Sequence, residues 1–416
     1  MSVADPLARA DHSRPDVPLE EARRGAGGKT LLEDGCYFLA YGNDLDVWYE
    51  GTLRVSSRNG ETLASGDLYA VTQAAADDPQ PIGLLSPRGP GIPIFPIADY
   101  TYYLRVTNIA PAEGGFDLTF EAYRFCAKVV RKLDSGLTLR WESDGTFTAR
   151  MKAAAAPPGY PAPDRFFVGE VPTNPLQPSQ LQMGWVSPSL RKAVIEIDRV
   201  PDSKVPQDNY AGTNWQSIFQ SFGWEVNVIV SNDDVTKKTS DPLWNKGDAD
   251  TTMRARRDNA NLDTEWRFYI LVASKIFAPS EGFGYMYHPT REALFMTSQH
   301  VFPENEAQWG ALRGKRFDTT VAFFRTAVHE MGHAMSLGHS QKGFGFMRPT
   351  ETIAAEAPAD NPFPANIDWS FAPDDVHRLR HWPDITVRPG GPDRVAGDMP
   401  LPGDPPRSLS QPSDCC

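Results

Sequence analysis

The sequence predicts an α+β protein in two parts, with an all-β, sandwich-like domain before a domain of mixed strands and helices. Three observations lead to this prediction. Short strand patterns fill residues 29–156, a proline-rich stretch follows at 157–189, and strand and helix patterns alternate over 190–385. A chain of 416 residues is long enough for two domains, and its 40% hydrophobic and 23% charged residues are ordinary for a globular protein.

The β-rich N-terminal domain, 29–156, consists of short apolar runs separated by turn signals. Arg58-Asn59-Gly60 is one such signal, typical of a tight hairpin turn. The expected strands are 36–40, 52–55, 102–106, 116–120, 137–141 and 146–151. This pattern favours a β-sandwich, with a small barrel as the alternative, and the sequence carries no known binding motif that would give the domain a role. The stretch 157–189 is expected to be a proline-rich linker.

The second domain, 190–385, alternates strands with helices. Its expected strands are 193–198, 224–231, 266–274 and 293–301, and its expected short helices are 215–222 and 248–257. The polar stretch 232–265 contains aspartates that could bind calcium, but they do not have the spacing of an EF-hand loop. Calcium is therefore an option that the sequence does not support.

A longer helix is expected to begin at Asp318, which is a good N-cap. An apolar stripe with steps of three and four residues follows, formed by Val321, Phe324, Val328, Met331 and Met335. His329 and His333 are four residues apart and lie off this stripe on one helical face. The stripe can therefore pack against a sheet while both imidazoles face a cleft.

Three histidines, His329, His333 and His339, fall within eleven residues together with Glu330. Imidazole nitrogens are common zinc ligands, and catalytic zinc takes three protein ligands and keeps an open position for water. Gly338 permits a sharp exit from the helix that can return His339 toward the other two rings. Glu330 can act as general base on the activated water. The sequence thus predicts one catalytic Zn²⁺.

The segment His329 to His339 resembles the long zinc-binding motif of the metzincin metalloproteases, and the matrixin-like branch most closely. Phe346-Met347-Arg348-Pro349 resembles the Met-turn of that family, in which the methionine lies beneath the metal. Residues 372–382 resemble its closing helix. The resemblance covers roughly 190–385 and implies a metzincin-like catalytic domain with a mixed twisted sheet, an active-site helix, a Met-turn and a C-terminal helix.

The resemblance implies a zinc-dependent metalloendopeptidase that hydrolyses protein or peptide substrates by metal-activated water, with Glu330 as general base. It also implies that an edge strand at 293–301 pairs with the substrate backbone. Ser336 stands where the family has glycine, and a left-handed backbone at serine costs on the order of 1 kcal/mol. Two alternatives stay open: an inactive zinc-containing binding or scaffold protein whose β domain recognises a partner, and a β domain that acts as an inhibitory prodomain.

The net charge and the two ends of the chain indicate which partners and which location to expect. A net charge of −12 argues against nucleic acid, and the chain lacks an apolar run of roughly 18 residues for a transmembrane helix. Residues 1–28 are expected to be a disordered leader without the apolar core of a signal peptide, and 386–416 a disordered tail. We therefore expect a cytoplasmic protein or one exported by a non-classical route, although the resembled family is usually secreted.

The four cysteines are too few for a disulfide framework. Cys36 and Cys126 could pair inside the N-terminal domain, and the sequence leaves this open. Cys36 could instead cap the zinc, as a prodomain cysteine does in secreted matrixins, but the motif that surrounds such a cysteine is missing here.

Overall fold

The computed structural model describes residues 31–42, 47–58, 60–71, 92–126, 140–171, 179–237, 243–259, 262, 265–276, 283–286, 291–391 and 401–403. Their strands form a closed barrel, a five-stranded sheet and a two-stranded sheet. Within these ranges no helix is long and apolar enough to cross a membrane. The expected leader, 1–28, lies outside the described residues.

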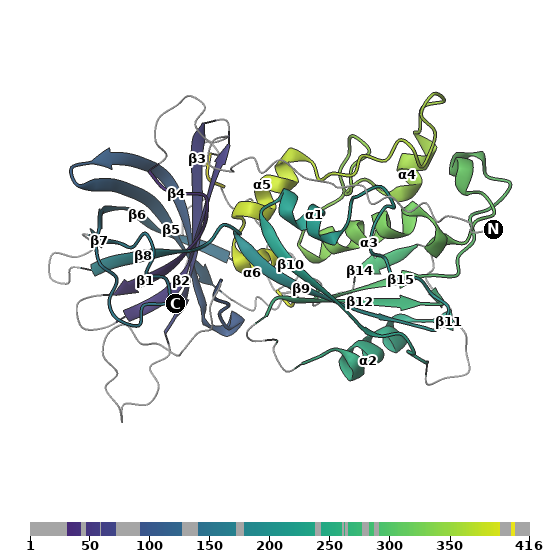
Figure 1. Ribbon diagram of the computed structural model, residues 1–416, viewed down its shortest axis with the longest axis horizontal. Helices are drawn as coiled ribbons and strands as arrows, with labels where there is room; N and C mark the ends of the chain where they lie inside the picture. Colours follow the sequence, from purple (N-terminus) through teal and green to yellow (C-terminus); the bar gives the residue numbers. More distant parts are fainter. Residues whose placement is uncertain are drawn as a thin grey trace, which may run out of the picture. The chain divides into compact units, whose positions relative to one another are not determined.

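The first eight strands close into an antiparallel barrel, in which each strand pairs with the next and β8 pairs with β1 (Figure 1). The strands are β1 (Gly35–Gly42), β2 (Val47–Arg58), β3 (Glu61–Ala70), β4 (Tyr100–Ala112), β5 (Gly115–Cys126), β6 (Arg140–Ala153), β7 (Phe167–Val171) and β8 (Ser179–Ser187). The predicted fold class, a metzincin-like α+β domain preceded by a sandwich, is therefore wrong. Alternating side chains do not distinguish the two architectures, because a sandwich and a barrel both bury every second residue.

The barrel continues beyond the predicted domain boundary at residue 156. Both β7 and β8 lie inside 157–189, the stretch that we expected to be a linker. Its prolines fall outside these two strands, as expected where a strand needs its backbone N–H groups. Leu181 and Met183 of β8 are buried in the barrel core. The proline content concealed two strands that close the barrel.

The second sheet has the strand order β10-β9-β12-β15-β14, with β14 antiparallel to β15 and the other pairs parallel. Its strands are β9 (Arg191–Arg199), β10 (Trp224–Asn232), β12 (Arg267–Ala273), β14 (Gly284–Met286) and β15 (Ala293–Thr297). We expected the edge strand at 293–301, but β15 is buried between β12 and β14. The edge belongs to β14, whose three residues are too few to give a sequence pattern.

The helices pack around this sheet. They are α1 (Trp215–Ser221), α2 (Lys246–Arg256), α3 (Val321–Ala334), α4 (Thr350–Ala355), α5 (Pro373–His381) and α6 (Asp384–Val387). The short elements are η2 (Ile97–Asp99), η3 (Ala307–Leu312), η4 (Phe317–Thr319) and the paired strands β11 (Leu243–Trp244) and β13 (Lys275–Ile276). Side chains of α1, α3 and the sheet share one buried apolar cluster, which fixes α3 in place.

A buried polar network joins the outer face of the barrel to α6. Arg54 of β2 forms ion pairs with Asp67 of β3 and with Asp384 of α6, the latter at 3.1 Å. Asp384 also accepts hydrogen bonds from Tyr69 Oη at 3.0 Å and from Arg191 Nε at 2.9 Å. Burial alone would raise the pKa of Asp384, but Arg54 and Arg191 hold it below its usual value.

The neighbouring helix α5 joins the same face of the barrel through His381, which is fully buried. Its two ring nitrogens lie 2.9 Å from Ser56 Oγ and 3.1 Å from Ser65 Oγ. Tyr103 donates a hydrogen bond to the His381 carbonyl at 3.0 Å. The polar groups of α5 and of strands β2 to β4 thus satisfy one another.

The predicted tail begins inside α6. Thr386 and Val387 are buried, and so is Arg388, which donates to the Phe95 carbonyl at 2.9 Å. The prediction placed the domain end at 385 because a single helical turn is too short to show periodicity. At the other end of this region, β9 follows β8 after residues 188–190 only.

Candidate metal centre

The helix that carries the first two histidines is α3, and it begins later than predicted. Its N-cap is Thr320, and the expected N-cap, Asp318, lies in the preceding turn η4. The buried Asp318 carboxylate instead accepts hydrogen bonds from the Lys204 backbone at 3.0 Å and from Arg316 at 2.8 Å. Asp318 therefore fixes the approach to α3 and does not cap it.

The apolar stripe of α3 packs as predicted. Four of its members, Phe324, Val328, Met331 and Met335, are buried in the sheet cluster, and Val321 packs against that cluster from a partly buried position. Because the stripe is buried, the opposite face of the helix presents His329 and His333 toward the loop that follows α3.

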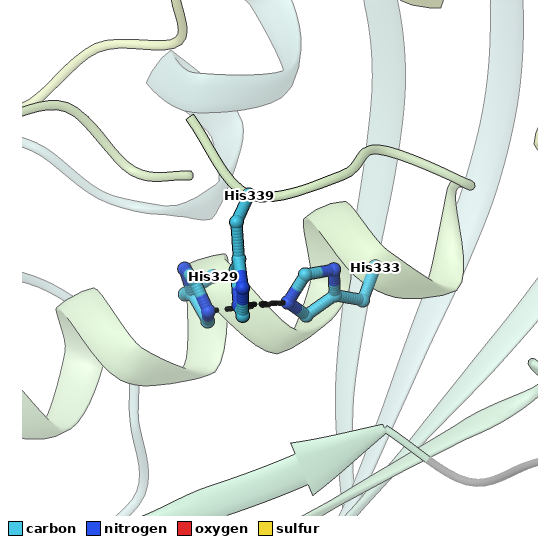
Figure 2. A group of neighbouring side chains, drawn as sticks. All are labelled: His329, His333 and His339. Atoms are coloured by element: carbon cyan, nitrogen blue, oxygen red, sulfur yellow. Dashed lines mark hydrogen bonds between the residues drawn. The ribbon is translucent and has the colours of Figure 1, made fainter. Parts of the chain in front are cut away.

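The three predicted histidines come together at one point (Figure 2). His333 Nε2 lies 3.2 Å from His329 Nε2 and 3.0 Å from His339 Nε2. His329 and His333 project from α3, and His339 descends from the loop above the helix. Burial decreases from His329 through His333 to the exposed His339, so the site opens on the side of the loop.

The other ring nitrogens determine which atoms can bind a metal. His329 Nδ1 lies 2.6 Å from the Phe346 carbonyl, and His333 Nδ1 lies 2.8 Å from the Leu337 carbonyl. A carbonyl only accepts hydrogen bonds, so each Nδ1 carries the proton and each Nε2 presents a lone pair. Burial, followed by Arg325 and His333, lowers the pKa of His329 well below its usual value. These are the neutral imidazoles that metal ions require.

The chain leaves α3 through a left-handed residue, which is Ser336 with φ of 68°. We expected Gly338 to provide the sharp exit, but Gly338 is not among the positive-φ residues. Backbone bonds from Ser336 N to His333 O and from Leu337 N to Gly332 O close the turn, each at 2.9 Å. This turn brings the chain back over α3, so that His339 faces His333.

Met347, the predicted Met-turn residue, is buried with its sulfur against Gly332 of α3. A Cβ atom at Gly332 would overlap the Met347 sulfur, so only glycine lets the two segments approach this closely. The Met347 carbonyl accepts a hydrogen bond from Ser340 N at 2.8 Å. Met347 is thereby connected both to the helix and to the segment after His339.

Arg325 is a residue at this site that the sequence reasoning missed. It lies one helical turn before His329, is fully buried, and donates to the carbonyls of Gly345, Phe346 and Arg348. Burial lowers its pKa to about 10. Arg325 holds the turn whose Phe346 carbonyl fixes the His329 ring. The available signal was an arginine inside an otherwise apolar part of α3.

Glu330 is buried next to His329, and it faces the edge strand β14. Burial raises its pKa to about 8, while a hydrogen bond from the Met286 backbone and the charge of Arg325 act in the opposite direction. Its Cγ lies in contact range of Gly284, where any larger residue would crowd the strand. The Glu330 side chain therefore lies between α3 and β14, the last strand of the sheet among the described residues.

The other candidate ligands lie elsewhere or do not cluster. Cys36 is a free, buried thiol whose pKa is raised to about 12 by burial, with Arg54, Asp384 and Arg191 as its charged neighbours. It therefore neighbours the barrel network and not the histidines. The Cys126 side chain lies outside the described part of the chain. Across the described ranges, the histidine trio is the one group of three or more His, Cys, Asp or Glu residues close enough to share a metal ion.

Comparisons with known proteins assign no family. No protein-family model matches the chain, and no curated protein sequence is detectably similar to it. The functional conclusion therefore depends on the geometry of the site and on the residues that form it.

Proposed function

We propose that this protein is a zinc-dependent metalloendopeptidase. The observation that carries the proposal is the convergence of one ring nitrogen each from His329, His333 and His339 within 4.8 Å, with the buried Glu330 next to His329 on the same helix. Lone pairs that face one another repel, and a cation between them removes that repulsion. Three imidazole nitrogens with one open side are the donor set of catalytic zinc.

The chemistry divides between the metal and Glu330. Zinc bound by the three imidazoles would supply a Lewis acid that polarises a carbonyl and lowers the pKa of water. Glu330 would accept a proton as water attacks the scissile carbonyl and would deliver it to the leaving amine. The carboxyl group would hold the proton between these two steps.

The edge strand β14 supports a peptide as the substrate. It is the last strand of its sheet, and Glu330 contacts it through Gly284 and the Met286 backbone. An extended peptide can pair with an open strand edge through its own backbone groups. A substrate aligned in this way would pass beside the Glu330 carboxyl group and the histidines.

The test is Glu330→Gln, with Glu225→Gln as its matched control. Glu225 is an exposed carboxylate of β10, at the other end of the strand order from β14. We expect both variants to retain about one zinc per chain, and Glu330→Gln to lose at least about 100-fold in peptide hydrolysis. Peptide cleavage by Glu330→Gln at the wild-type rate would contradict the role of Glu330. Zinc binding by a wild-type protein that cleaves no peptide would favour the inactive scaffold instead.

A further inference from the structure

Ser336 makes a contact that a glycine at its position would not make. Its hydroxyl group donates a hydrogen bond to the Thr386 carbonyl of α6 at 2.8 Å. Its backbone is left-handed, which is strained for serine and free of strain for glycine. Ser336 lies between His333 and His339, so the contact ties the loop of the third ligand to α6.

The helix α6 has a single turn and cannot hold its own position in isolation. The barrel holds it. Asp384, its first residue, is bonded to Arg54 and Tyr69 of the barrel, and the Asp384 backbone N donates to Asp67 Oδ1 at 3.1 Å. Two residues after Asp384 comes Thr386, the partner of Ser336.

These contacts form a continuous path from the barrel to the metal ligands. It runs from strands β2 and β3 through Asp384 and Thr386 to Ser336, and from there to the turn that carries His339. The same turn supplies the Leu337 carbonyl that fixes the His333 ring. A shift of α6 would therefore move both His339 and the hydrogen-bond partner of His333.

We propose that Ser336 is a positioning residue through which the barrel sets the metal affinity of the three histidines. The proposal rests on the metal site proposed above. It makes the barrel a permanent part of the functional protein, because its removal would leave Asp384 without Arg54 and Tyr69 in a region that is now buried. That is the opposite of an inhibitory prodomain, which is released to give activity.

The experiment compares Ser336→Gly with Ser336→Ala in the full chain. Zinc affinity is measured by competition with a chromophoric chelator, and the melting temperature is measured with the metal removed. Both variants lose the hydroxyl group, so each should raise the zinc dissociation constant roughly tenfold. Glycine also relieves the left-handed strain, so Ser336→Gly should melt no lower than wild type in the absence of metal, whereas Ser336→Ala should melt lower.

A second pair of variants tests the contribution of the barrel. Tyr69→Phe removes one hydrogen bond to Asp384, and Tyr102→Phe removes one hydrogen bond, to Asp144, elsewhere in the same barrel. We expect a roughly threefold rise in the zinc dissociation constant for Tyr69→Phe and none for Tyr102→Phe.

The outcomes separate this proposal from the peptidase assignment. Wild-type zinc affinity in Ser336→Gly and Ser336→Ala would overturn the role of Ser336, even if the protein cleaves peptides. Affinities that simply follow the melting temperatures would overturn it as well, because Ser336 would then be only structural. Weakened affinity in a protein that cleaves no peptide would support the positioning role and contradict the peptidase. Absence of zinc binding by the wild-type chain would overturn both.

Discussion

Two buried polar clusters of this protein differ in how their charges are balanced. In the cluster between the barrel and α6, the carboxylates of Asp67 and Asp384 are paired with Arg54 and Arg191. In the histidine cluster, three imidazole nitrogens lie close together, with His333 Nε2 at 3.2 Å from His329 Nε2 and 3.0 Å from His339 Nε2. In the first cluster the buried charges are paired with opposite charges, and we interpret it as structural. The second is a group of three residues that could hold a metal ion, and this contrast is why we propose a function for it.

The strongest test of the contrast removes one member of the histidine cluster. His333→Ala should weaken zinc binding at least about a thousandfold, because a site with two imidazoles has lost a ligand. Its metal-free stability should change by less than about 1 kcal/mol, since no paired charge is stranded. Calorimetric zinc titration and urea unfolding measure the two effects. His377→Ala, a histidine of α5 outside the cluster, should bind zinc normally, and zinc binding by His333→Ala like that of wild type would end the ligand assignment.

Removing one member of the cluster between the barrel and α6 should instead have its largest effect on stability. Asp384→Ala leaves Arg54 and Arg191 buried with too little negative charge, so the free energy of unfolding should fall by about 3 to 5 kcal/mol. Urea unfolding of the metal-free protein measures this loss. Asp374→Ala removes an exposed carboxylate in the first turn of α5 and should cost less than about 1 kcal/mol. Equal effects of the two substitutions would show that the barrel network is not essential to the fold.

A smaller effect on stability is expected when the pH is lowered, and it arises from His381. Burial, followed by His377 and Arg54, lowers the pKa of His381 well below 6.5. The unfolded chain therefore binds a proton below pH 6.5 that the folded chain does not bind, and stability is lost as the pH falls. In metal-free protein, His381→Gln should remove up to about 1.4 kcal/mol per pH unit from the acid side of the stability curve. Identical slopes for wild type and variant between pH 6.5 and 5 would contradict this assignment.

The sequence predicted the histidine site well because the site is local. A four-residue spacing on one helix and a short return loop bring His329, His333 and His339 together with little dependence on distant residues. Met347 is also close in sequence to the helix against which it packs. Arg325 was not recognisable, because most of its acceptors are backbone carbonyls, which any residue type supplies, and its one side-chain acceptor, Thr350, is 25 residues away in the sequence.

The fold was less predictable where it depends on distant pairings. The pairing of β1 with β8 closes the barrel, and it joins segments on either side of six other strands. The order of strands in the second sheet also depends on pairings between segments that are distant in the sequence. We therefore expected the edge strand at 293–301, whereas it is β14. The position of α6 depends on an ion pair with β2 and a hydrogen bond with β3. The residues around 386 do not reveal these contacts in the sequence.

The connection at 188–190 has a consequence for anyone who wishes to divide this protein. Leu190 is buried and its backbone N donates to the Gly223 carbonyl at 2.7 Å, so the connection is itself part of the second sheet's packing. A processing enzyme needs several accessible residues in an extended strand, and this junction offers a poor target. Grafting the barrel onto another scaffold would require a new joint within these few positions, without disturbing the strand that begins at Arg191.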